Sequence, residues 1–217
     1  MDDKQLRQKV VDELEFDPSI DTSHISVAVE DGVVTLNGHV GSYYEKFDIE
    51  RVVRRVKGVT AIAEEIGVRF PSDKKISDDE IARRAINILQ WYAVIPQEAV
   101  QVTVQRGLVT LSGQVNWQYQ KKAAEDAVRK LSGTIGIVNN ITIAPKVEPL
   151  DVQKKIEDAL RRRTEVEAKA IRINVRDRNK ISLEGIVDSW DEREAAENAA
   201  WSVAGVQAVD NRLTIVR

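Results

Sequence analysis

Hydrophobic residues recur at intervals of four in three stretches of the chain, and each stretch then changes to alternation. The intervals of four are set by Leu6, Val10 and Leu14, by Ile81, Ala85 and Leu89, and by Val152, Ile156 and Leu160. The alternating apolar positions are Ile25, Val27 and Val29, then Val100, Val102 and Val104, then Ile171, Ile173 and Val175. Each stretch is therefore predicted to begin with an amphipathic helix followed by a half-buried strand.

A second alternating segment follows a turn in each stretch and carries a glycine. The segments span 34–40, 109–115 and 181–187, after turns that hold Gly32, Gly107 and Asn179. The glycines form three pairs, Gly38 and Gly58, Gly113 and Gly133, and Gly185 and Gly205. We expect the first of each pair to let a helix approach the sheet closely, and the second to take the left-handed conformation that ends a helix. The pairs repeat with offsets of 75 and 72 residues, which indicates three copies of one module.

A second helix is predicted after each of these strands. Capping boxes are formed by Ser42 and Glu45, by Ser189 and Glu192, and, ahead of the first helix of the middle copy, by Ser77 and Glu80. In the middle copy Trp117 stands at the position of the second-helix serine, so Asn116 is the expected cap. Trp117 replaces a serine where no core volume is needed, and we expect it to be exposed.

A third strand completes each copy and carries a polar residue on its apolar face. These residues are Glu64, Asn139 and Asn211, and each is expected to hydrogen-bond loop or helix-end backbone. The chain is thus predicted to be an α+β protein of three tandem αββαβ modules, each with two helices packed on a three-stranded sheet. We name residues 1–70 module 1, residues 77–144 module 2 and residues 148–217 module 3, joined by short proline-bearing linkers at 71–75 and 145–149.

The repeated pattern resembles the BON-domain family of bacterial modules. The resemblance rests on the V-x-L-x-G-x-V core of each second strand, on the pairs Gly58-Val59 and Gly205-Val206, and on Asn139 and Asn211 ahead of the last strand. Glu64 and Thr134 depart from the family pattern. The resemblance implies proteins tied to envelope and osmotic stress, some described as binding phospholipid surfaces and one cytoplasmic relative implicated in potassium binding. It implies no catalysis.

Composition excludes several classes of function. The 217 residues are 42% hydrophobic and 31% charged, as in an ordinary soluble chain, and no apolar run is long enough to cross a bilayer. Without cysteine, and with only His24 and His39 as histidines, the chain offers no metal or cofactor site. No catalytic constellation is found, so we expect no enzyme activity. The formal charge is −5 for residues 1–70, +2 for 71–144 and 0 for 145–217, too little positive charge to predict nucleic-acid binding.

Large aromatic residues distinguish module 2 from the other copies. The candidate contact residues for lipid or a partner are Trp91, Tyr92, Trp117, Tyr119, Lys121 and Lys122. Amphipathic rings beside ammonium groups suit an anionic lipid surface or a protein partner, although such rings also cover the edges of small cores. Trp201 aligns with Arg54 and Arg129 on the polar face of a helix and is expected to make a contact between modules.

These residues predict a non-catalytic, stress-associated binding protein whose partner is an anionic phospholipid surface or a protein client. Two alternatives stay open: a potassium or other monovalent-cation sensor, and a structural scaffold that forms homo-oligomers. The first residues lack a basic segment followed by an apolar one, so the expected location is the cytoplasm, or the periplasm if a signal peptide was removed.

Overall fold

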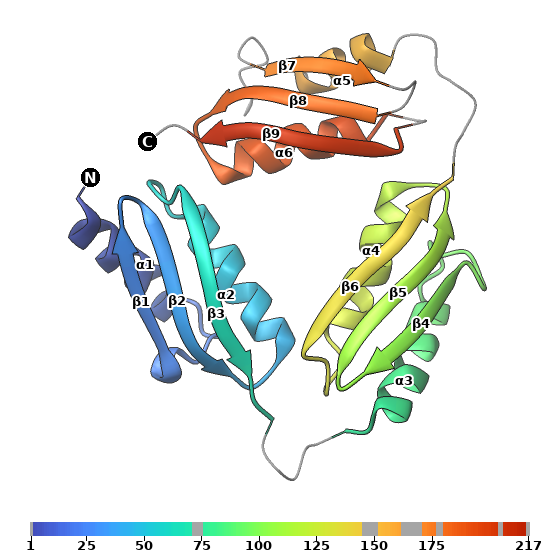
Figure 1. The fold of residues 1–217 in the computed structure, drawn as a ribbon, viewed down its shortest axis with the longest axis horizontal. Helices are drawn as coiled ribbons and strands as arrows, with labels where there is room; N and C mark the ends of the chain where they lie inside the picture. The colour runs from blue at the N-terminus through green and yellow to red at the C-terminus, as the bar shows by residue number, and fades with distance from the viewer. Residues whose placement is uncertain are drawn as a thin grey trace. The chain divides into compact units, whose positions relative to one another are not determined.

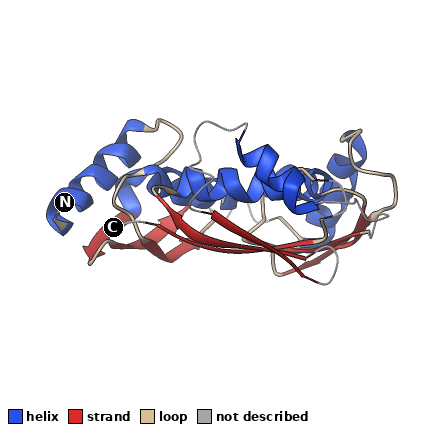
Figure 2. Ribbon diagram, turned by 90° about the horizontal axis from the view of Figure 1, so that it is seen from above, coloured by secondary structure: helices blue, strands red, loops and turns tan. Residues whose placement is uncertain are grey.

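The computed structural model describes residues 2–70, 76–144, 152–161, 171–176, 180–203 and 206–215. Within each of the three modules two helices lie on one side of a three-stranded sheet (Figures 1 and 2). The α+β class and the three αββαβ modules predicted from the pattern are confirmed. The predicted linkers fall in ranges outside the described residues.

The helices and strands follow the predicted order in every module. Module 1 contains α1 (Asp3–Phe16), the short 3-10 helix η1 (Thr22–His24), β1 (Ile25–Glu30), β2 (Val33–Val40), α2 (Tyr43–Arg55) and β3 (Ala61–Val68). Module 2 contains α3 (Asp78–Trp91), β4 (Val100–Gln105), β5 (Leu108–Val115), α4 (Gln118–Arg129) and β6 (Gly136–Ile143). Module 3 contains α5 (Val152–Arg161), β7 (Ile171–Arg176), β8 (Lys180–Val187), α6 (Trp190–Trp201) and β9 (Ala208–Ile215).

The second strand of each module is the central strand of its sheet. The strand orders are β1-β2-β3, β4-β5-β6 and β7-β8-β9. In modules 1 and 3 the first two strands pair as an antiparallel hairpin, and the third strand pairs parallel to the second. The second helix makes the crossover that a parallel pair requires.

Each core lies between the helices and one face of the sheet. Leu36, Leu111 and Leu183 occupy equivalent positions in the central strands and are fully buried. They pack against the predicted helical stripes, whose buried members include Leu6, Val10 and Leu14 in α1, Ile81, Ala85 and Leu89 in α3, and Ile156 in α5. The burial of Val152 and Leu160 lies outside what the structure describes.

The hairpin turns carry positive φ at two successive residues, as a type I′ turn requires. The φ angles are 51° and 77° at Asp31 and Gly32, and 51° and 79° at Arg106 and Gly107, so the positive φ expected at Gly32 and Gly107 is confirmed. Asn179 lies outside the described residues.

A carboxylate at the start of the first helix binds the amides of each of these turns. Asp3 accepts hydrogen bonds from the amides of Asp31 and Gly32, at 2.9 and 3.1 Å. Asp78 does the same for the amides of Arg106 and Gly107, at 2.7 and 2.9 Å. The carboxylate therefore fixes the first helix to the tip of the hairpin in both modules.

The first ladder glycines of modules 1 and 2, Gly38 and Gly113, do not serve the close helix approach that we predicted. Gly38, Gly113 and Gly185 have φ of 141°, 130° and 141°. A Cβ at Gly38 would lie well under 3.0 Å from the backbone carbonyl oxygen of His24, and one at Gly113 equally close to that of Ala99. The obstacle is therefore the backbone leading into the first strand, where Gly38 pairs with Ile25 and Gly113 with Val100.

The second glycine has the positive φ that we predicted, but it lies beyond the helix end. Gly58 and Gly133 have φ of 104° and 92°, and they lie in the turns after α2 and α4, which end at Arg55 and Arg129. A Cβ at Gly133 would lie 2.8 Å from the side chain of Ile81. This glycine therefore lets the turn pack against the first helix. Gly205 lies outside the described residues.

Two of the three capping boxes are confirmed. Ser42 accepts a hydrogen bond from the amide of Glu45, and Ser189 from that of Glu192, both at 3.1 Å. Ser77 is the N-cap of α3 but makes no capping hydrogen bond. Its hydroxyl bonds the carboxylate of Asp79 instead, and this bond is the main cause of the lowered pKa of Asp79.

The polar residue of the third strand ties that strand to the N-terminal half of the second helix. Asn139 donates to the carbonyl oxygen of Lys121 at 3.2 Å and to Glu125 at 3.0 Å, and it accepts from the amide of Ile141. Asn211 makes the equivalent bonds in module 3. In module 1 Glu64 instead forms an ion pair with Lys46 at 2.9 Å. The predicted bond to helix-end backbone is confirmed for Asn139 and Asn211, whose carbonyl partners, Lys121 and Arg193, lie in the first turn of the second helix. Glu64 instead accepts from the amide of Ile66 in its own strand.

Thr134 leaves a polar atom unpaired in the core of module 2. Its side chain is fully buried and, within the described residues, its hydroxyl has no hydrogen-bond partner, whereas modules 1 and 3 have the buried Val59 and Val206 at this position. Because an unpaired buried hydroxyl costs free energy, we expect Thr134→Val to raise the free energy of unfolding of module 2 by about 1 kcal/mol. Hydrogen exchange of the α3 and β6 amides measures the change, and unchanged or lower protection would contradict it.

Candidate functional site

The end of α3 presents large exposed apolar side chains. Trp91 is the last residue of the helix, and its side chain is 86% exposed. Tyr92 caps the helix and is 38% exposed, and Val94 in the following loop is 45% exposed. The amide of Tyr92 donates to the carbonyl oxygen of Leu89, and its carbonyl accepts from the amide of Ile95. The exposed residues therefore stand on an ordered helix end and turn.

Gln120 holds this loop against the first turn of α4. Its side chain is buried, and its amide nitrogen donates to the carbonyl oxygen of Val94 at 2.9 Å. The same turn of α4 carries Tyr119, which is 56% exposed, the half-buried Lys121 and the exposed Lys122. We call Trp91, Tyr92, Tyr119, Lys121 and Lys122 the aromatic end of module 2.

The other predicted contact residues are placed differently. Trp117 directly precedes α4 and is half-buried, so the prediction that it is exposed was wrong. Trp201 is half-buried against the core of its own module, and its indole N–H donates to Glu197 at 3.4 Å. Its predicted role between modules stays a prediction.

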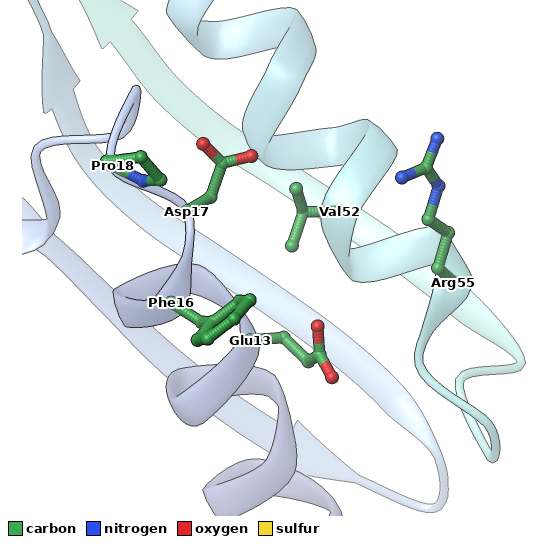
Figure 3. A pocket seen from close by; sticks show the side chains of 6 residues that line it. All are labelled: Glu13, Phe16, Asp17, Pro18, Val52 and Arg55. Atoms are coloured by element: carbon green, nitrogen blue, oxygen red, sulfur yellow. The ribbon is translucent and has the colours of Figure 1, made fainter.

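Module 1 has an open groove between α1 and α2, shown in Figure 3. The groove has a volume of about 340 Å³ and is lined by Glu13, Phe16, Asp17, Pro18, Val52 and Arg55. Val52 is buried and belongs to the core, whereas the Phe16 ring is 85% exposed. Glu13, Phe16 and Asp17 come from the end of α1, and Val52 and Arg55 project from α2 (Figure 3). The groove therefore joins an apolar wall to two carboxylates and one guanidinium.

Phe16 and Trp91 are the same position in two copies of the module. Each ends the first helix of its module, and the exposures of 85% and 86% are nearly identical. Phe16 was not among the residues predicted from the sequence, because that prediction considered only the positions of tryptophan and tyrosine. Aligning the two helices by the offset of 75 residues would have revealed it.

The residues around these two aromatic rings differ in chemistry. The positions of Glu13, Asp17, Pro18, Val52 and Arg55 are taken in module 2 by Ile88, Tyr92, Ala93, Ala127 and Lys130. Module 2 therefore surrounds its ring with apolar groups and a cation, and module 1 surrounds its ring with carboxylates and a cation.

The two histidines, which the sequence presents as unrelated, lie together in module 1. The rings of His24 and His39 stack with centroids 4.5 Å apart and planes inclined by 14°. Desolvation, with Arg69 and His24 nearby, lowers the pKa of His39, so its ring stays neutral to lower pH than an ordinary histidine. Within the described residues, no group of three or more histidine or acidic side chains is arranged to hold a metal ion.

The repeated modules match one known family along almost the whole chain. The model of the BON domain matches residues 2–69, 77–145 and 150–217. The chain belongs to the BON-domain family. The osmotically-inducible protein Y of Escherichia coli strain K12 is 30% identical over 145 residues, which cover 65% of this chain and 72% of that protein.

Two solved structures were also matched, both of CdsD, a structural protein of the type III secretion system of Chlamydia trachomatis. One is 14% identical and covers 98% of this chain and 92% of its own, with a TM-score of 0.27. The other, the C-terminal domain of CdsD, is 15% identical with full coverage of both chains and a TM-score of 0.27.

In module 2 the exposed Tyr119 shares a turn of α4 with Lys121 and Lys122. Rings with an apolar face and a polar edge, near ammonium groups, are typical of interfaces between apolar and anionic groups. Among the described helices, none combines the length and the apolar composition needed to cross a membrane.

Proposed function

We propose that this BON-domain protein is a non-catalytic, stress-associated binding protein that contacts anionic phospholipid surfaces through the aromatic end of module 2. The observation that carries the proposal is Trp91, a tryptophan 86% exposed at the end of a helix. Membrane contact of an indole is most favourable in free energy where the ring reaches the boundary of the acyl chains and the N–H stays among the lipid headgroups. The role in stress is supported by the likeness to an osmotically inducible protein.

Lysines on α4 supply the electrostatic part of the contact. Lys121 and Lys122 stand on the turn that Gln120 ties to the loop after Trp91. A lysine near an anionic membrane contributes about 1 kcal/mol at moderate salt, and the attraction falls off within a Debye length. Binding should therefore weaken as the salt concentration rises.

The test is co-sedimentation of the full chain with vesicles of phosphatidylcholine and phosphatidylglycerol at low and high salt. We expect Trp91→Ala to weaken binding about tenfold, the loss that ~1.4 kcal/mol of interfacial contact implies. We expect Lys121→Gln with Lys122→Gln to weaken it at low salt and to flatten its salt dependence. Phe16→Ala, which removes the equivalent exposed ring from module 1, is the matched control, and the binding that phosphatidylglycerol adds over phosphatidylcholine alone should be the same as for the unchanged chain.

Absence of binding at low salt, or binding that Trp91→Ala leaves unchanged, contradicts the lipid proposal. A protein client then becomes the better candidate for the same surface. The cation-sensor alternative predicts a rise in melting temperature with potassium that sodium does not produce. The scaffold alternative predicts concentration-dependent assembly that Trp201→Ala abolishes.

A further inference from the structure

We propose that the module 1 groove binds a small zwitterion of the phosphoethanolamine type, with its ammonium group against Glu13 and Phe16 and its phosphate against Arg55. The site is distinct from the aromatic end of module 2 and does not depend on it. The residues that line the groove determine the chemistry of the ligand.

The α1 side of the groove carries the features of an ammonium site. Glu13 and Phe16 lie one helical turn apart on α1 and both line the groove, where the Phe16 ring is 85% exposed, whereas the carboxylate of Asp17 points away from them (Figure 3). An aromatic face and carboxylates together attract organic cations, through the ring quadrupole and through charge-assisted hydrogen bonds. Hydrogen bonds from the hydroxyl and amide of Ser19 lower the pKa of Asp17, which keeps this carboxylate charged in mildly acidic solution.

The α2 side of the groove carries a guanidinium that has no competing partner on its own helix. Arg51 pairs with Asp48 at 2.6 Å, and Arg54 pairs with Glu50 at 2.6 Å. Arg55 forms no ion pair with any described residue; it lines the groove, and its positive charge contributes to the lowered pKa of Asp17. A guanidinium is suited to bind a phosphate with two parallel hydrogen bonds. Ligands with a cation at one end and an anion at the other therefore match the two walls.

The equivalent site of module 2 shows that the chemistry of this groove is not common to all copies of the fold. Ile88 and Tyr92 take the places of Glu13 and Asp17, so the carboxylates are absent at the equivalent site, while the exposed aromatic ring is kept. If the ring alone explained the groove, both modules would bind the same ligand. The carboxylate of Glu13 makes the ammonium preference specific to module 1.

The first test titrates O-phosphoethanolamine into the 15N-labelled full chain and follows amide shifts by NMR. We expect saturable shifts at Phe16, Asp17, Ser19 and Arg55, and none at Trp91. Glu13→Gln should weaken binding about tenfold, as the loss of a charge-assisted hydrogen bond implies, and Phe16→Ala should also weaken it. These side chains are exposed, so the variants are expected to fold.

Two further titrations identify which wall of the groove binds the ammonium group and which binds the phosphate. Arg55→Gln should weaken binding of O-phosphoethanolamine but should not weaken binding of ethanolamine alone, which loses a repelling cation, whereas Glu13→Gln should weaken both. Trp91→Ala is the matched control and should leave both titrations unchanged. Shifts that do not saturate, or that Glu13→Gln leaves unaltered, would overturn the proposal.

Vesicle binding then distinguishes a lipid headgroup from a free compound as the source of the zwitterion. In co-sedimentation of the full chain carrying Trp91→Ala, vesicles of phosphatidylcholine with phosphatidylethanolamine are compared with phosphatidylcholine alone. Binding that needs phosphatidylethanolamine and is lost in Glu13→Gln assigns the site to a lipid headgroup. Binding of the free compound without that vesicle effect assigns it to a free zwitterion. Because the module 2 proposal is tested on phosphatidylglycerol, failure of one proposal leaves the other standing.

Discussion

Replacing Gly38 with alanine is expected to lower the free energy of unfolding of module 1 by about 3 kcal/mol, because the new methyl group meets backbone that has no room to move. The φ of 141° disfavours any residue with a Cβ, and the carbonyl oxygen of His24 occupies the space where that Cβ would lie. Relief would require the chain entering β1 to shift away from its pairing of Ile25 with Gly38. The strain therefore falls on the first pair of the sheet.

Gly67→Ala is the matched control for this substitution. Gly67 lies in β3 of the same sheet without a positive φ, and the nearest atom to an added Cβ is the carbonyl oxygen of Gly38 at 3.9 Å. We expect a change within about 0.5 kcal/mol. Module 1 contains no tryptophan, so hydrogen exchange read by mass spectrometry over β1, β2 and α1 is the suitable measurement. Equal protection in the two variants would show that the backbone contact at Gly38 is not rigid.

The order and burial of the elements follow from periodicity, because burial of one face imposes a spacing on the chain. Leu6, Val10 and Leu14 are buried as their spacing of four indicates, and Leu36 and Leu111 as their alternation indicates. Such buried positions can be predicted from the sequence because the spacing of residues on one face is fixed within a single helix or strand.

The role of the first ladder glycine was not visible in the same way. The side-chain alternation of β2 places Gly38 on the helix-covered face, which suggested a neighbouring helix as the constraint. The actual obstacle is a carbonyl oxygen fourteen positions earlier, brought close by the antiparallel pairing of β1 and β2. Contacts between backbone atoms leave no residue-type signal at the partner position, since any residue supplies a carbonyl.

The candidate sites were predictable only in part. Trp91 and Tyr92 stand out because tryptophan and tyrosine are rare in this chain. The bond from Gln120 to Val94 was not foreseen, because glutamine at this position replaces the Glu45 of module 1, which instead accepts from the amides of Asp21 and Gly41. One amide side chain thus ties the aromatic loop of module 2 to α4, and a spacing pattern contains no information about that bond.

Asp78→Ala is the second large effect that we expect, a loss of about 2 kcal/mol from the free energy of unfolding of module 2. The carboxylate accepts two hydrogen bonds, at 2.7 Å from the amide of Arg106 and at 2.9 Å from that of Gly107. Arg106 has a φ of 51°, unusual for a residue with a side chain, so the turn relies on this bond to keep its shape. Hydrogen exchange of the β4 and β5 amides measures the loss.

Asp79→Ala separates the turn contact from the general effect of a negative charge at the helix start. Asp79 is the next residue of the same first turn, so its removal takes the same favourable charge from the helix dipole. Its own partners are Arg83 and the hydroxyl of Ser77 at the protein surface, and we expect the β4 and β5 amides to keep their protection.

Asp78→Asn tests the geometry of the two bonds directly. The amide keeps the size of the carboxylate but offers one acceptor oxygen, and it turns a donor toward one of the two turn amides. We therefore expect protection between that of the unchanged chain and that of Asp78→Ala. If Asp78→Asn and Asp79→Ala lowered protection as much as Asp78→Ala, charge at the helix start would be the cause. Asp3 makes the same pair of bonds in module 1. We therefore expect Asp3→Ala to lower the protection of the β1 and β2 amides as Asp78→Ala lowers that of the β4 and β5 amides.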